Sequence, residues 1–154
     1  MKLHFKLFAG LLLVLILTGC IGEDYDVGVP TAHLEMDSQK KRLVEANIHW
    51  NTESENVHET ITDIQKFALS QDEIKVSSNQ EATLEFKENK RNGGDIWSDP
   101  KITAVLLKDE EQIEITTSAY TDFKFPSEKG NYVLKVEFKS TAGSAQYVGN
   151  IVVQ

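Results

Sequence analysis

The chain of 154 residues contains a single cysteine and only three prolines. One cysteine excludes an internal disulfide framework and a zinc site built from several cysteines. Basic residues are also scarce, with 16 Lys and Arg against 24 Asp and Glu and a formal charge of −8. Because phosphate binding needs a basic surface, this balance argues against nucleic acid as a partner. The length and a hydrophobic content of 40% suit one domain with a substantial core.

The first nineteen residues differ in composition from the rest of the chain. Lys2 and Lys6 precede an almost wholly apolar run from Leu7 to Leu17, and no acidic residue occurs before residue 20. A charged start followed by a short apolar run is typical of a secretory signal peptide. At about 1.5 Å per residue the run is roughly 17 Å long, which is too short to cross a hydrocarbon core of about 30 Å. Removal of residues 1–19 takes away two lysines and changes the formal charge to −10.

The apolar run ends in Leu17-Thr18-Gly19-Cys20, which resembles the lipobox of bacterial lipoproteins, including those of Gram-positive bacteria. The resemblance implies cleavage between Gly19 and Cys20, a diacylglycerol on the Cys20 thiol and often an acyl chain such as palmitate on the new amine. Each buried CH₂ contributes about 0.8 kcal/mol, so two or three chains would anchor the protein to the outer face of the cell membrane. Residues 20–30 carry three acidic and no basic residues, and we expect them to form a solvated tether.

From residue 31 to residue 154, apolar and polar residues alternate along most of the chain. This period of two predicts antiparallel strands with one buried and one solvated face, in a single domain. After two N-terminal runs, the predicted strands are 73–76, 82–86, 102–107, 112–116, 122–125, 131–138 and 146–153. Helical spacing of Ile61, Ile64 and Ala68 predicts one or two helical turns within residues 58–69.

One predicted strand carries a more specific pattern. Residues 130–136 read Gly-x-Tyr-x-Leu-x-Val, which resembles the start of strand F in immunoglobulin-like domains. The resemblance implies that the Tyr132 hydroxyl bonds back to the upstream backbone, and that residues 72–154 form the immunoglobulin-like part of an all-β antiparallel sandwich. Leu134 stands where antibody domains place a cysteine, so an inter-sheet disulfide is excluded. A small open barrel and another Greek-key sandwich remain as alternative folds.

Residues 31–36 and 44–51 together predict an extra N-terminal β-hairpin, because pairing them places their apolar residues on one face. In that register His33 and His49 lie on the outer face, with their backbones about 7–8 Å apart. Imidazoles at this distance can share a zinc or copper ion with a third ligand. The candidates for that ligand are Glu35, Glu45 and His58. The alternative is that these residues are solvated polar residues on a strand surface.

The segment 87–100 is long for a connection within a sandwich, and long loops on rigid scaffolds often bind partners. Lys90 and Arg91 add basic charge to an otherwise acidic protein, and Ile96 and Trp97 could provide an apolar anchor. In the alternative arrangement, Trp97 packs beneath the loop and closes the edge of the sandwich. We therefore treat Lys90, Arg91 and Trp97 as candidate binding residues.

The sequence shows neither a Gly-x-Ser-x-Gly nucleophile motif nor a phosphate-binding loop. Lipidation would also consume the only thiol, so we expect neither a catalytic site nor a cofactor. The expected function is that of a membrane-anchored binding or assembly module outside the cytoplasm, whose partner is an envelope protein or polymer. A proteinase inhibitor of immunoglobulin-like fold and a metal-binding lipoprotein are the alternatives.

Overall fold

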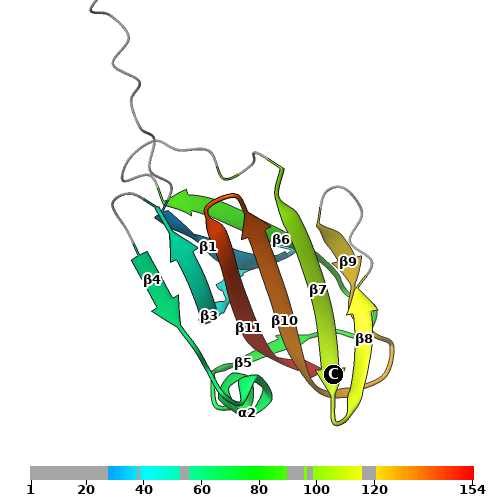
Figure 1. Cartoon of the computed structure of the whole chain (residues 1–154). Helices are drawn as coiled ribbons and strands as arrows, with labels where there is room; N and C mark the ends of the chain where they lie inside the picture. The colour runs from blue at the N-terminus through cyan, green and yellow to red at the C-terminus, as the bar shows by residue number, and fades with distance from the viewer. Residues whose placement is uncertain (1–27, 38, 53–55, 90–95, 97–98, 116–120) are drawn as a thin grey trace, which may run out of the picture.

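The computed structural model describes residues 28–37, 39–52, 56–89, 96, 99–115 and 121–154. Within these ranges the chain forms two β-sheets that pack face to face, with one short helix on the outside of the larger sheet (Figure 1). The predicted all-β sandwich is therefore confirmed. In the described residues no helix is long and apolar enough to cross a membrane.

The smaller sheet has four strands in the order β2–β1–β6–β9. Their bounds are Gln39–Arg42, Gly28–Met36, Glu81–Asn89 and Asp122–Lys124. The larger sheet contains the path β4–β3–β11–β10–β7–β8. Its strands span Asn56–Glu59, Val44–Asn51, Gly143–Val153, Gly130–Ser140, Lys101–Lys108 and Glu111–Ile115. Strand β5, Glu73–Val76, pairs in parallel with the C-terminal end of β11, whereas the other strand pairs are antiparallel.

The strands from β5 to β11 correspond to the seven predicted runs, and their pairing resembles that of an immunoglobulin-like sandwich. Strand β6 pairs with β9 in one sheet, while β7, β10 and β11 are neighbours in the other. The tyrosine corner expected at Tyr132 is present, because its hydroxyl donates to the backbone carbonyl of Glu128 at 2.9 Å. This contact ties the start of β10 to the turn before it.

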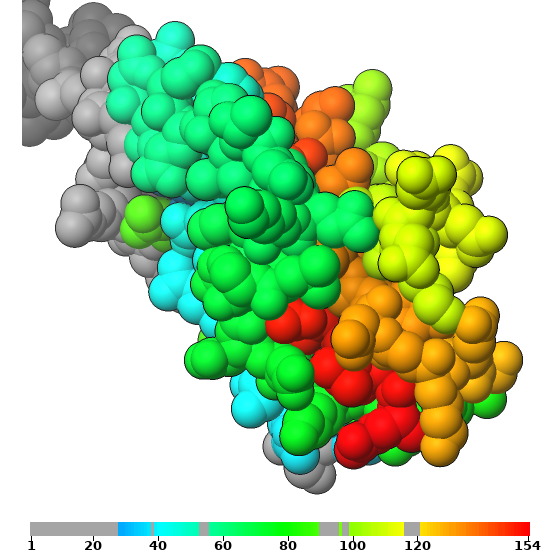
Figure 2. All heavy atoms as spheres, turned by 90° about the horizontal axis from the view of Figure 1, so that it is seen from below, coloured from blue at the N-terminus to red at the C-terminus, as the bar shows by residue number. Residues whose placement is uncertain are grey.

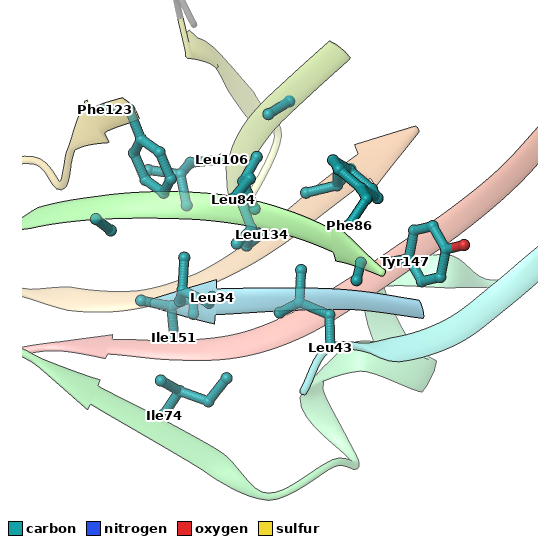
Figure 3. Packing of buried hydrophobic residues seen from close by; sticks show 14 of the residues in the cluster. Leu34, Leu43, Ile74, Leu84, Phe86, Leu106, Phe123, Leu134, Tyr147 and Ile151 are labelled. Carbon is teal, nitrogen blue, oxygen red and sulfur yellow. The ribbon is translucent and has the colours of Figure 1, made fainter. Parts of the chain in front are cut away.

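A single core lies between the two sheets. On β10 the alternating residues Tyr132, Leu134, Val136 and Phe138 all point into it and are at most 1% exposed. Side chains of both sheets meet there, as Leu34 on β1 and Leu134 on β10 show in Figure 3. Burial of each large apolar side chain contributes about 1.5–3 kcal/mol, so this shared core is the main source of stability.

A second, smaller apolar cluster covers the outer face of the larger sheet. Helix α2, Ile64–Leu69, places Ala68 against Ala46, Val133 and Val148. Viewed from below in Figure 2, the green part of the chain that includes α2 lies between the cyan N-terminal strands and the red C-terminal residues. The one or two helical turns predicted within residues 58–69 are confirmed, and they form α2. The first residues of that range are instead part of β4, because they pair with β3.

The predicted pairing of residues 31–36 with residues 44–51 is wrong. Strand β1 pairs with β2 on one side and with β6 on the other, whereas β3 belongs to the larger sheet. The chain turns at Asp37, which has a positive φ of 47°, and forms only a short hairpin with β2. It then crosses to the other sheet after Leu43, whose N–H donates to the carbonyl of Ala32 at 2.9 Å.

A register shift in β3 explains why the alternation of apolar residues in 44–51 led to the wrong pairing. The shift lies between the partners Ala145 and Tyr147 of β11. Before it, Val44 and Ala46 pack in the cluster under α2, and after it Ile48 and Trp50 enter the main core. The four apolar residues of this strand therefore serve two different faces. At the other end of the region, β1 begins at Gly28, inside the segment 20–30 expected to be a tether.

Candidate functional site

Several candidate residues from the sequence lie outside the described residues. These are Gly19, Cys20, Lys90, Arg91 and Trp97. Their neighbour Ile96 is 1% exposed and belongs to the main core, so it does not form an exposed anchor. The segment that contains these basic residues begins next to Asn89, which is paired with Gly28 at the start of β1. Gly28 and Asn89, the described residues next to the N-terminal segment and the candidate loop, therefore lie side by side.

The structure separates His33 from His49. His33 lies on β1 of the smaller sheet, opposite Arg42 and Glu85. His49 lies on β3 of the larger sheet, opposite His58 and Ser144. The pairing of His33 with His49 on which the candidate metal site depended is wrong, because the two histidines belong to different sheets.

His33 is part of a basic cluster on the outer face of the smaller sheet, formed with Lys40, Arg42 and Lys87. Burial lowers the pKa of His33, and the charges of Lys40, Lys87 and Arg42 lower it further. The Nδ1 atom of His33 has no hydrogen-bond partner among the described residues. Burial and then Lys87 also lower the pKa of Lys40, which forms an ion pair with Glu85. Crowded positive charges of this kind favour an anionic contact.

The far end of the same face is acidic. A hollow of about 590 Å³ is lined there by Glu35, Asp37, Glu81 and Asp122, with Lys124 beside them. Lys124 forms an ion pair with Glu81 at 3.0 Å. The outer face of the smaller sheet therefore carries opposite charges at its two ends.

The structure brings His49 and His58 into direct contact. Their Nδ1 atoms are 2.9 Å apart, and their ring centroids are 4.3 Å apart with the planes inclined at 72°. Both side chains are exposed on the outer face of the larger sheet, where β4 ends the strand order. Gly143 permits the close approach of β11 to this part of β3, since a Cβ atom there would lie 2.1 Å from the carbonyl oxygen of His49.

Two further depressions lie along the sheet edges. One, of about 330 Å³, lies beside β11 between the part of that strand that pairs with β3 and the part that pairs with β5. Asn150 lies there and donates its Nδ2 to the carbonyls of Gln71 at 3.0 Å and Leu69 at 3.3 Å, which gives it a structural role. The other, of about 270 Å³, lies between β8 and β9 and has Leu106, Phe123 and Pro126 in its lining.

The direct pairing of His49 with His58 was not predicted, because one or two helical turns were expected within residues 58–69 and His58 was only a candidate third ligand beside His33 and His49. The sequence does carry one indication of strand β4, because Val57 is an apolar residue between polar neighbours, as expected for a short strand. Comparison of the chain with family models, with curated proteins and with solved structures finds no match.

Proposed function

We propose that the protein is a lipid-anchored, non-catalytic binding module on the outer face of the cell membrane. The observation that carries this proposal is the segment Leu17-Thr18-Gly19-Cys20 behind a basic and apolar leader. Strand β1 begins at Gly28, so only residues 21–27 would separate the lipidated cysteine from the folded domain. A tether this short keeps the sandwich close to the membrane, where its partner would be a component of the envelope.

The edge of the larger sheet at β8 is the surface best suited to contact a partner. Edge strands can accept an added strand from another chain, and exposed apolar side chains favour such contacts. Ile113 on β8 is 39% exposed, and the depression between β8 and β9 lies beside it. An extended segment of an envelope protein that places an apolar side chain in this depression would fit the surface.

Partition into detergent tests the anchor. The wild-type protein expressed in a bacterial host should enter the detergent phase and carry the added mass of a diacylglycerol. The Cys20→Ala variant should carry no lipid mass and should remain as the uncleaved precursor. If the variant carries the same lipid mass and is cleaved at the same site, the proposed anchor is wrong. The urea unfolding midpoint of wild-type and variant domains serves as the folding control.

Site-specific photocrosslinking on intact cells tests the contact surface. A photoreactive residue at position 113 should capture an envelope component, and a second probe at position 97 examines the candidate loop. Leu69 on α2 is the matched control, because it is 46% exposed and lies on a different surface. Equal capture from positions 69 and 113 would show that β8 is not the specific contact.

A further inference from the structure

The contact between His49 and His58 places two imidazole nitrogens, which are common metal ligands, side by side on an exposed surface. We propose that these two histidines form a binding site for a divalent transition metal, with Cu²⁺ preferred. The site differs from the one expected from the sequence, because His33 has no part in it. It also stands independently of the proposed lipid anchor.

The distance between the two nitrogen atoms supports this assignment. The two Nδ1 atoms are 2.9 Å apart. If a metal ion lay about 2.0–2.1 Å from each of them, the nitrogen–metal–nitrogen angle would be about 90°. Right angles between neighbouring ligands are typical of the tetragonal geometry of Cu²⁺ and Ni²⁺. A tetrahedral zinc ion would need a separation of about 3.3–3.4 Å, given the same bond lengths. Because 2.9 Å is also the length of the hydrogen bond between the two rings, this separation shows that both nitrogens can reach one ion but does not select the metal. The preference for copper follows from the general order of affinities, which places copper first.

Metal binding would replace an existing hydrogen bond without net loss of a proton. At present one imidazole donates from Nδ1 and the other accepts, if both rings are neutral. Transfer of that proton from Nδ1 to Nε2 of the same ring frees both Nδ1 lone pairs. Both side chains are exposed, so water can solvate the relocated N–H group.

The backbone already holds the two ligands in place. His49 and His58 are direct partners in the antiparallel pair β3–β4, which limits the movement needed to receive an ion. The same face of β3 is fixed by Asn47, which donates to Gln146 at 3.0 Å and accepts from the N–H of Ile61 at 2.6 Å. A group of three or more metal-binding side chains does not occur among the described residues, so the other positions on the ion would be open to water.

Titration of the purified full-length protein with Cu²⁺ at neutral pH tests the proposal. His49→Ala and His58→Ala should each weaken copper binding at least tenfold in calorimetry. His33→Ala is the matched control and should bind copper as the wild type does, because His33 lies on the other sheet. His4 lies in the leader and is the same in the wild type and in all three variants, so a loss specific to positions 49 and 58 assigns the site.

Electron paramagnetic resonance supplies an independent readout. The copper spectrum of the wild type should show coupling to two imidazole nitrogens, and each single variant should lose one of them. Unchanged circular dichroism would confirm that the variants fold, and His58→Gln offers a second polar substitution if His58→Ala does not. Copper affinity equal in the wild type and both variants, or no copper binding by the wild type, would overturn the proposal.

Discussion

Two tyrosine hydroxyls join separate parts of the chain through hydrogen bonds to backbone carbonyls. Tyr132 donates to the carbonyl of Glu128 within the tyrosine corner. Tyr147 on β11 donates to the carbonyl of Pro30 on β1 and thereby connects the two sheets. Burial, with a further contribution from Glu45, raises the pKa of Tyr147 well above its ordinary value. The folded protein therefore favours the neutral form of this side chain.

The Tyr147→Phe variant should be less stable at neutral pH by about 1–3 kcal/mol, because the carbonyl of Pro30 loses its buried donor. Since the pKa of Tyr147 is raised on folding, its stabilising effect should be present below pH 10 and should decline as the pH rises further. Denaturation in urea at pH 7 to 11 measures both effects. A difference between wild type and variant that stays constant from pH 9 to 11 would contradict the assignment.

Helix α2 is the element whose stability depends most on its surroundings. It has six residues, whereas isolated helices shorter than about 12 residues are marginal in water. The helix is maintained by its N-cap, where the Asp63 side chain accepts from the N–H of Lys66 at 2.9 Å, and by contact of Ala68 with the sheet. Its position in turn covers Val133 and Val148, which otherwise would be exposed apolar residues of a strand surface.

Loss of the N-cap tests the contribution of this helix. Asp63→Ala should lower the free energy of unfolding by about 1 kcal/mol, because the N–H of Lys66 loses its acceptor. Asp63→Asn keeps a side-chain oxygen in the same place and should retain most of the stability. Urea midpoints of the three proteins provide the measurement, and equal losses in both variants would argue against capping as the cause.

At the scale of the whole molecule, the N-terminal strands complete both sheets of the immunoglobulin-like part. Strands β1 and β2 extend the smaller sheet beyond β6, while β3 and β4 extend the larger sheet beyond β11. These segments contribute large side chains to the common core, namely Leu34, Met36, Leu43, Ile48 and Trp50. The described residues thus form one unit with a shared interior rather than a sandwich with a separate appendage.

A chain of residues 61–154 should therefore fail to fold, although it contains all seven strands from β5 to β11. Burial of the five missing side chains contributes roughly 7–15 kcal/mol in total. This is comparable to the whole stability of a typical domain, about 5–15 kcal/mol. Residues 28–154 serve as the control and should unfold in one cooperative thermal transition. A similar cooperative transition in the shorter chain would show that the N-terminal strands are dispensable.

Much of the sandwich followed from the alternation of apolar residues. A side chain that points inward requires its neighbours to point outward, and this local rule predicted β5 to β11. The Tyr132 contact was implied instead by the resemblance of residues 130–136 to strand F of immunoglobulin-like domains. The same rule does not say which strand pairs with which. The partners of β1 were predicted wrongly, because the register shift in β3 and the crossing at Leu43 depend on contacts distant in the sequence.

The sequence by itself determined the positions of β5 to β11, the all-β class and the acidic charge, and it supports the expectation of a lipidated Cys20. These properties depend on residue type and on spacing between near neighbours. Only the tertiary structure decided that His49 meets His58 while His33 lies among Lys40, Arg42 and Lys87. The physical reason is that strand pairing joins distant segments through backbone hydrogen bonds, whose partners are selected by the packing of the whole core.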